Sequence, residues 1–350
     1  MKIWIDALTP KQLIFFHFVS HVLRKSGHDV YITTRDYHDS NYIVNRLGMK
    51  VQVIGKHGGK KPEDKLIASL QRSLELVPFV KDLSPNLSIS FSSPEAARVS
   101  TGMGLVHVAV NDSPHSSWVA KLTIPLSSLL FSPWVIPNKA WRQYGIDSRK
   151  IISYRALDPA AWLKRRELWP KQTEFERSSA GAVIIRAAET HASYMGKQRL
   201  SLVNLAILLA ERFRDKKLIL LPRYKEQEEE LQSLDAPNVM ICKEPFFGPN
   251  LLQSASLLIG GGGTMNAEAS LLGVPVISFY EGPATYVENY LVKTGFVRKV
   301  RNEKECIREA ADLLENSTRE RLVKRAELEL ASMEDPSEVI ASKINELQTG

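Results

Sequence analysis

Four consecutive glycines, residues 260–263, form the segment of the chain with the clearest capacity for chemistry. Glycine lacks a Cβ atom, so such a loop can turn sharply and leave its backbone N–H groups open to a ligand. The residue that follows, threonine, is a typical N-cap, and the helix that we expect it to start would direct its positive end toward the loop. An anion, most often phosphate, is the expected occupant. The nucleotide-binding candidates here are Gly261, Gly262, Gly263 and Thr264.

The alternative explanation for this loop is a tight turn with close packing of a helix on a strand, although one or two glycines would suffice for that. A dinucleotide-binding fingerprint would need glycine where Met265 stands, and a P-loop would need a Gly-Lys-Ser/Thr ending. The loop is therefore expected to belong to another nucleotide-binding fold.

Two arginines are the best candidates for cations that assist phosphate binding. Arg186 and Arg223 each come directly after a predicted parallel strand, where side chains reach the ligand-binding edge of a sheet. Arginine is the residue suited to bidentate contacts with phosphate. Surface ion pairs are the alternative for both. His191, in the loop after Arg186, could contact substrate or simply be solvated.

Polar side chains also follow the predicted strands of the first half, and these are the candidates for catalysis. Asp112 lies in the segment 111–115, directly after a buried strand, where a proline stiffens the turn. This carboxylate could act as a general base, and His115 could act as a base or contact a phosphate. The alternative is an Asx-type turn that caps the next helix. Asp6 and Glu95 follow two other strands, although Glu95 could instead simply occupy the first turn of its helix.

Missing motifs narrow the chemistry. The sequence contains no Asp-x-Asp, no Gly-x-Ser-x-Gly hydrolase elbow and no His-Glu-x-x-His zinc motif. We therefore expect no built-in metal site and no cofactor.

The composition predicts two globular domains in a reducing compartment. With 350 residues, of which 44% are hydrophobic and 24% are charged, the chain can build two cores. The two cysteines, Cys242 and Cys306, predict a cytoplasmic location without a disulfide framework. The chain starts directly in a strand, so no signal peptide is expected, and no apolar run approaches the ~20 residues needed to span a bilayer.

The net charge of +7 favours acidic partners such as sugar nucleotides, anionic membranes or nucleic acid. The basic residues are scattered, and only 164–166 form a cluster, so nucleic acid is not expected as a partner. The apolar run at residues 13–18 extends beyond one face of its predicted helix. Peripheral membrane contact, burial in a homodimer and ordinary packing would each explain this, and the acceptor of any transfer reaction stays unknown.

Strand and helix alternate along the whole chain, which predicts parallel sheets covered on both faces. Strands are expected at residues 2–5, 29–33, 51–54, 86–91, 105–110, 150–153, 182–186, 217–221, 238–241, 256–260, 274–278 and 296–299. Helices are expected near residues 10–26, 40–47, 62–80, 94–101, 138–144, 197–212, 226–233, 248–255, 265–272, 286–294, 303–330 and 336–347. The apolar stretch 122–137 is interrupted by three prolines and receives no assignment.

The predicted domains are 1–158, an N-terminal acceptor or catalytic domain, and 180–330, a nucleotide-sugar domain. Residues 159–179 would be the linker, and a C-terminal helix in 331–350 would pack back on the first domain. The expected fold is α/β, with two doubly wound Rossmann-like domains facing each other across a cleft. Ligands would bind at the carboxyl ends of the strands.

The second half resembles the nucleotide domain of GT-B enzymes, which include glycosyltransferases of the peptidoglycan lipid-intermediate type and non-hydrolysing UDP-N-acetylglucosamine 2-epimerases. The shared pattern is a glycine loop, a glutamate a few residues later and Gly-x-Pro-hydrophobic, found here at 260–263, Glu268 and 273–276. In such enzymes the matching glutamate accepts hydrogen bonds from both ribose hydroxyls of a uridine nucleotide, and two carboxylate oxygens suit a vicinal diol. The resemblance implies this role for Glu268, which would otherwise be a solvated glutamate.

Nearly the whole chain is also similar to an uncharacterised prokaryotic family called domain of unknown function 354. The matching segments are 4–6, 35–37, 55–59, 93–96, 111–115, 221–224 and the glycine loop. This resemblance implies a GT-B fold but does not settle the reaction, since one fold hosts many functions.

Three functions fit these features. The first is a metal-independent glycosyltransferase that uses a nucleotide diphosphate sugar, with UDP as the expected nucleotide. The second is an epimerase of the sugar nucleotide itself. The third is a nucleotide-sugar-binding protein without catalysis. Similar epimerases place further carboxylates beyond the fifth strand, but no acidic residue occurs from 113 to 140, and Arg186 stands near the position of their histidine. We therefore rank transfer above epimerisation.

Overall fold

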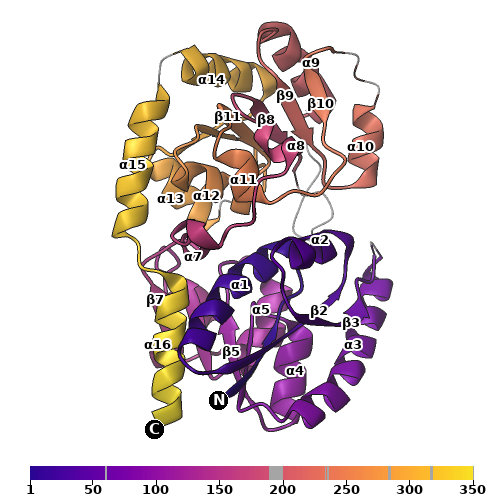
Figure 1. Cartoon of the computed structure of the whole chain (residues 1–350), viewed down its shortest axis with the longest axis vertical. Helices are drawn as coiled ribbons and strands as arrows, with labels where there is room; N and C mark the ends of the chain where they lie inside the picture. Colours follow the sequence, from indigo (N-terminus) through magenta and orange to yellow (C-terminus); the bar gives the residue numbers. More distant parts are fainter. Residues whose placement is uncertain are drawn as a thin grey trace. The chain divides into compact units, whose positions relative to one another are not determined.

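The computed structural model describes residues 1–59, 61–188, 200–232, 234, 236–282, 285–315 and 318–349. It divides the chain into two compact units (Figure 1). Unit 1 comprises Met1–Trp169 together with Met333–Gly350, and unit 2 comprises Pro170–Ser332. The chain therefore returns to unit 1 after completing unit 2.

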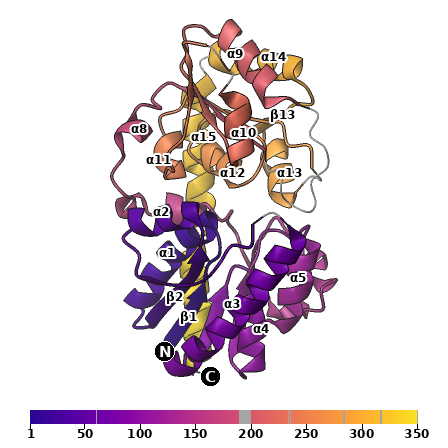
Figure 2. The ribbon, with the colours of Figure 1, turned by 90° about the vertical axis from the view of Figure 1, so that its right-hand side faces the viewer.

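Unit 1 contains a seven-stranded parallel sheet in the order β3-β2-β1-β4-β5-β6-β7. Its strands are β1 (Lys2–Asp6), β2 (Asp29–Asp36), β3 (Val51–Lys56), β4 (Leu87–Ser90), β5 (Val106–Val110), β6 (Leu129–Pro133) and β7 (Ile151–Tyr154). Its helices are α1 (Pro10–Lys25), α2 (His38–Arg46), α3 (Pro62–Leu83), α4 (Pro94–Gly102), α5 (Ser117–Thr123), α6 (Lys139–Arg142), α7 (Ala160–Leu163) and α16 (Pro336–Thr349). Helices α3, α4 and α5 lie side by side on one face of the sheet, opposite α1 and α2 (Figure 2).

Unit 2 contains a six-stranded parallel sheet in the order β10-β9-β8-β11-β12-β13. Its strands are β8 (Val183–Arg186), β9 (Leu218–Leu221), β10 (Val239–Ile241), β11 (Leu257–Gly260), β12 (Val276–Ser278) and β13 (Val297–Lys299). Its helices are α8 (Glu174–Arg177), α9 (Leu202–Arg212), α10 (Lys225–Leu231), α11 (Gly248–Leu252), α12 (Thr264–Leu271), α13 (Tyr286–Lys293), α14 (Glu303–Glu315) and α15 (Thr318–Ser332).

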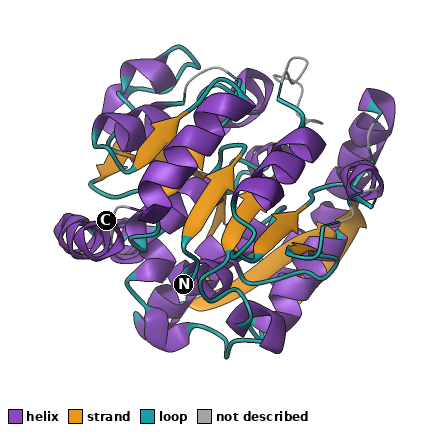
Figure 3. Ribbon diagram, turned by 90° about the horizontal axis from the view of Figure 1, so that it is seen from above, coloured by secondary structure: helices purple, strands orange, loops and turns teal. Residues whose placement is uncertain are grey.

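Both sheets start from a central strand, extend to one edge and then continue on the other side of that strand. The strands are drawn in orange among purple helices in Figure 3. This is the doubly wound order, in which the switch point lies between β1 and β4 in unit 1 and between β8 and β11 in unit 2. The prediction of two doubly wound Rossmann-like halves is confirmed. Ligands of such sheets bind beyond the carboxyl ends of the strands at the switch point.

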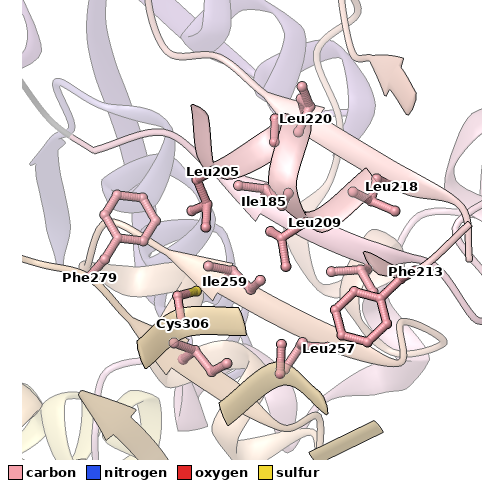
Figure 4. Close-up of a cluster of buried hydrophobic side chains, with 14 of the residues drawn as sticks. Ile185, Leu205, Leu209, Phe213, Leu218, Leu220, Leu257, Ile259, Phe279 and Cys306 are labelled. Carbon is pink, nitrogen blue, oxygen red and sulfur yellow. The ribbon is translucent and has the colours of Figure 1, made fainter. Parts of the chain in front are cut away.

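Apolar side chains of unit 2 pack between its sheet and the helices α9 and α14. Ile185 and Ile259, from the two strands at the switch point, meet Leu205 and Leu209 of α9 and Cys306 of α14 in this core (Figure 4). These side chains are fully buried, which fixes the strand ends that carry the glycine loop.

One strand was missed, and one expected helix was wrong. Strand β6, in the stretch without an assignment, lies between β5 and β7. Its last residue is Pro133, and Pro125 falls in the preceding 3-10 turn, so the prolines stand at the ends of the strand, where they cost no central ladder bonds. The single helix expected at 303–330 is two helices, α14 and α15.

Ordinary packing explains the apolar excess of α1. Leu13, Phe15, Phe16 and Phe18 have no exposed surface. Helix α16 packs on α1, and His28, just after α1, lies 2.7 Å from Asn345 of α16 (Nε2 to Oδ1). The apolar side chains of α1 are therefore buried within unit 1 and not available to a membrane or to a second chain. Among the described residues, no helix combines the length and apolar character that a membrane span requires.

Candidate functional site

The glycine loop leaves the end of β11 in a conformation that only glycine readily adopts. Gly262 and Gly263 have φ values of 87° and 91°. A Cβ atom on Gly261 would lie 2.3 Å from the Cα of Ala188, and one on Gly262 would lie 2.9 Å from the ring of Tyr280. Close packing therefore explains these two glycines, as the alternative explanation proposed. Gly263 differs, because it is exposed, and a Cβ atom placed there would lie no closer than 3.8 Å to its nearest neighbour, the Nη2 of Arg223.

The expectation that Thr264 caps the helix was wrong. Helix α12 begins at Thr264, the N-cap is Gly263, and no side-chain cap bond forms. The backbone at Gly263 combines a positive φ with a ψ of −160°, a region that favours glycine, so threonine moves into the first turn. Thr264 is half-buried there, next to the exposed Gly263.

Asn266, in the first turn of α12, is a candidate that the sequence analysis missed. Its side chain is 4% exposed, and neither its Oδ1 nor its Nδ2 has a hydrogen-bond partner among the described residues. Buried amides normally have partners, so an amide left unsatisfied beside an anion loop suggests a polar ligand. Asn266 lies two positions after Thr264, so the sequence alone could have placed it among the nucleotide-binding candidates.

Glu268 lies about one turn after Thr264 in α12 and is 3% exposed, so it is not a solvated surface glutamate. Its Oε2 would lie 3.0 Å from a Cβ atom on Gly248, the first residue of α11. The carboxylate is thus directed to the start of α11, where glycine leaves room for it.

The two candidate arginines both lie at the end of the unit 2 sheet. Arg186 ends β8 and pairs in register with Gly260 across the switch point. Its guanidinium donates to the carbonyl oxygen of Pro222 at 2.8 Å and lies 5.7 Å from the ring centroid of Phe246. Arg223 donates from Nε to the carbonyl oxygen of Ala187 at 2.9 Å. This bond holds Arg223 with its Nη2 beside Gly263. His191, the other candidate of this region, lies outside the described residues.

In unit 1, Asp112 is part of a cluster that was only partly predicted. The Nζ of Lys11, in the first turn of α1, lies 2.5 Å from Asp112 Oδ2 and 2.7 Å from Asp158 Oδ2. Tyr154, the last residue of β7, donates from its hydroxyl to Asp158 Oδ1 at 2.5 Å. One ammonium therefore serves two carboxylates.

Burial and Lys11 move the pKa values of the two carboxyls in opposite directions. Burial would raise the pKa of Asp112, but the Lys11 ammonium outweighs burial and holds this pKa below its usual value. Burial raises the pKa of Asp158 to about 6, despite the attraction of Lys11. The pKa of His115 is lowered, because burial outweighs the attraction of Asp112. At neutral pH the cluster therefore holds an ionised Asp112 beside a neutral imidazole.

Asp6 and Glu95 are the other two candidate carboxylates of unit 1. Asp6 has no exposed surface, and Arg72 of α3 donates to both of its oxygens, from Nη1 at 2.9 Å and from Nη2 at 2.6 Å. Burial would raise the pKa of Asp6, but Arg72 outweighs it and lowers this pKa. Glu95 lies in the first turn of α4, is 4% exposed and accepts a hydrogen bond from Ser93 at 3.1 Å. Both carboxylates are thus buried, and their roles as catalytic candidates stay predictions.

Asp112 therefore acts electrostatically on His115, whereas Asp6 and Glu95 both interact with Arg72. Three partners were missed, namely Lys11, Tyr154 and Asp158. Lys11 lies near the start of a predicted helix, Tyr154 directly after a predicted strand and Asp158 at the predicted end of the first domain, but their sequence separation gave no sign that they meet.

The raised pKa of Asp158 predicts a pH-dependent effect of the substitution Asp158→Asn. The folded state binds the Asp158 proton more tightly than the unfolded state, so this carboxyl lowers stability as the pH rises through its folded pKa of about 6. Asparagine does not titrate. The free energy of unfolding of the variant, relative to the parent, should increase by about 3 kcal/mol between about pH 4 and pH 7.5.

Tryptophan fluorescence during denaturant titration measures this effect, because all six tryptophans lie in residues 1–169 and report on unit 1. A difference between variant and parent that stays constant across this pH range would contradict the assignment.

The fold and the strand order define the class of protein. It is a two-unit chain with a GT-B-like fold, and the glycine loop lies at the switch point of unit 2. The family model described as "Protein of unknown function (DUF354)" matches residues 1–348, and the chain belongs to this family. It is 25% identical to "Uncharacterized protein MJ0665" of Methanocaldococcus jannaschii, with 98% of both chains covered.

Solved structures share the fold at low sequence identity. UDP-GlcNAc 2-epimerase from Neisseria meningitidis, bound to UDP-GlcNAc, is similar with a TM-score of 0.76 and 16% identity, covering 99% of this chain and 100% of that one. The spinosyn forosaminyltransferase SpnP is similar with a TM-score of 0.67 and 15% identity, covering 100% of both chains. The GT-B-like fold thus occurs in epimerases and in transferases.

Proposed function

We propose that the chain is a metal-independent glycosyltransferase whose unit 2 binds a nucleotide diphosphate sugar, with UDP as the expected nucleotide. One observation carries this proposal. Gly263, the exposed end of the glycine loop, lies beyond the carboxyl end of β11 at the switch point, next to the half-buried Thr264 and with the guanidinium of Arg223 beside it. Similarity to solved structures of a UDP-GlcNAc-bound epimerase and of a glycosyltransferase supports the same ligand class.

Each group at this loop has a chemical task in the proposal. The N–H groups at the start of α12 and the guanidinium of Arg223 bind the diphosphate, and Arg186 adds positive charge at the neighbouring strand end. Glu268 accepts hydrogen bonds from the ribose hydroxyls. These groups also stabilise the charge that develops on the leaving diphosphate, the task that a metal ion performs in other designs.

Unit 1 supplies the proton acceptor. The lowered pKa of His115 keeps its imidazole neutral at neutral pH, which is the form that can accept a proton. The imidazole removes the proton from an acceptor hydroxyl as its oxygen bonds to the anomeric carbon of the sugar. The bond from that carbon to the diphosphate oxygen breaks, and the nucleoside diphosphate departs. Ionised Asp112 stabilises the imidazolium that results.

Epimerisation of the sugar nucleotide is the second candidate, and one observation favours it. Asp112 and Asp158 share Lys11, but the pKa of Asp112 is lowered and that of Asp158 is raised. Proton removal and return require one group that accepts a proton and one that donates it. Proton NMR of UDP-N-acetylglucosamine incubated with the protein alone separates the candidates. A new epimer formed without an acceptor selects epimerisation and contradicts transfer.

Glutamine at position 268 tests the nucleotide site. Glu268→Gln keeps the volume of the buried side chain but removes its charge, so binding of UDP should weaken about 10- to 100-fold. Isothermal titration calorimetry measures the dissociation constant. Glu320→Gln, an exposed glutamate in the first turn of α15, is the matched control and should bind UDP as the parent does. Equal affinity of Glu268→Gln and the parent would contradict the ribose assignment.

A further inference from the structure

Helix α3 of unit 1 exposes a stripe of large apolar side chains. Leu66, Ile67, Leu70, Leu74 and Val77 are 60%, 52%, 58%, 73% and 40% exposed, respectively. The helix runs along the outside of unit 1 beside α4 (Figure 2). Isolated apolar residues are normal on a surface, but a continuous stripe along a helix is typical of an interface.

The stripe follows the spacing of a helix that pairs with another helix. Positions 63, 67, 70, 74, 77 and 81 alternate steps of four and three residues, which places them on one narrow face. The opposite face carries the buried side chains of Ala68, Arg72, Leu76 and Val80, which hold the helix on the rest of unit 1. The pairing face is therefore directed away from the core of the unit.

This face is symmetric about position 72. In an antiparallel pair of two α3 helices centred there, Ile67 lies opposite Val77 of the second copy and Leu70 lies opposite Leu74. The outermost positions of the face carry opposite charges, Glu63 at the start and Lys81 at the end. Each glutamate would thus face a lysine of the other copy, at both ends of the pair.

We infer that two copies of this chain associate through α3 as an antiparallel pair around a two-fold axis. A two-fold interface must be complementary to itself, and a palindromic row of apolar and oppositely charged residues has this property. The antiparallel direction also places the N-terminus of each helix beside the C-terminus of the other, which their dipoles favour. A parallel pair would oppose Glu63 to Glu63 and Lys81 to Lys81. The inference is independent of the proposed reaction.

Sedimentation velocity across a range of protein concentrations tests the association. The parent should sediment as a dimer, and Leu70→Glu/Leu74→Glu should weaken the dimer by about 100-fold or more, because it buries four unpaired carboxylates. Both positions are exposed in the single chain, so the variant should fold. Leu328→Glu in α15, where the leucine is 74% exposed, is the matched control and should remain a dimer. A monomeric parent, or a double variant that still dimerises fully, overturns the inference.

Charge reversal tests the direction of the pair. Glu63→Lys and Lys81→Glu should each weaken the dimer, and combining them should restore it. Single variants that dimerise as tightly as the parent overturn the antiparallel arrangement, because a parallel pair would only exchange one like-charge pair for another.

Cross-linking tests the register. Ile67→Cys/Val77→Cys should form intermolecular disulfides on oxidation, whereas Ile67→Cys alone should not. Two copies of position 67 would lie about 15 Å apart along the axis, beyond the ~7 Å that a disulfide can span. The native cysteines, Cys242 and Cys306, are buried and should not interfere. Cross-linking of the single variant, or none in the double variant, overturns the register.

Discussion

Replacing Arg72 with methionine is expected to destabilise unit 1 by about 3–5 kcal/mol, because it leaves the carboxylate of Asp6 buried without a counterion. Both side chains are almost completely inaccessible, at 1% and 0% exposure, and their closest atoms lie 2.6 Å apart. Arg72 also donates from Nε to the carbonyl oxygen of Ile54 at 2.8 Å, so the end of β3 loses a partner as well. Methionine retains the unbranched stem but no donor.

Denaturant titration followed by tryptophan fluorescence should show this loss as an earlier unfolding transition of unit 1. Trp4 is a direct reporter, because its indole donates to Thr33, which in turn donates to Asp6. Arg149→Met is the matched control, since Arg149 is 89% exposed and pairs only with its neighbour Asp147 among the described residues, and it should leave the transition unchanged. Adding Asp6→Leu to Arg72→Met should recover part of the loss, because it removes the stranded charge. An unchanged transition in Arg72→Met would show that the pair contributes little.

The sequence was sufficient to predict the alternation of strands and helices, because buried parallel strands are continuous apolar runs and some helices begin with clear caps. Thr9-Pro10 and Ser93-Pro94 start α1 and α4 as such pairs should. Strand β6 was missed because prolines were taken as interruptions, whereas Pro133 ends the strand. Proline therefore marks the start of a helix reliably, but a proline at the end of a strand is easily taken for an interruption.

The partners of the charged residues could not be predicted, because they are set by the assembled sheet rather than by local spacing. Asp6 was predicted at the end of a strand, which is correct, but Arg72 is 66 residues away on another helix. Lys11 lies 101 residues from Asp112. A sequence pattern therefore identifies which strand ends carry polar groups, while burial and pairing decide which of these groups remain available for chemistry. The buried carboxylate of Asp6 is paired with Arg72, whereas Asp112 is half-buried and lies beside His115.

Replacing Lys11 with methionine is expected to destabilise unit 1 by about 3–5 kcal/mol near pH 8, because the carboxylates of Asp112 and Asp158 are then left together without a cation. Without Lys11, the two neighbouring carboxylates of Asp112 and Asp158 raise each other's pKa. The folded state then binds a proton more tightly than the unfolded state, so stability should rise as the pH falls through the raised pKa. Most of the loss should therefore be recovered near pH 5.

A second substitution identifies the cause of this loss. Asp158→Asn in the Lys11→Met background removes one of the two charges, so it should restore much of the stability near pH 8 and abolish most of the pH dependence. Lys25→Met, at an exposed position in the last turn of the same helix, is the control for losing a lysine from α1. A loss that is equal at both pH values, or that persists after Asp158→Asn, would mean that Lys11 stabilises unit 1 through its packing over the ring of Phe91, 4.5 Å away, rather than through the two carboxylates.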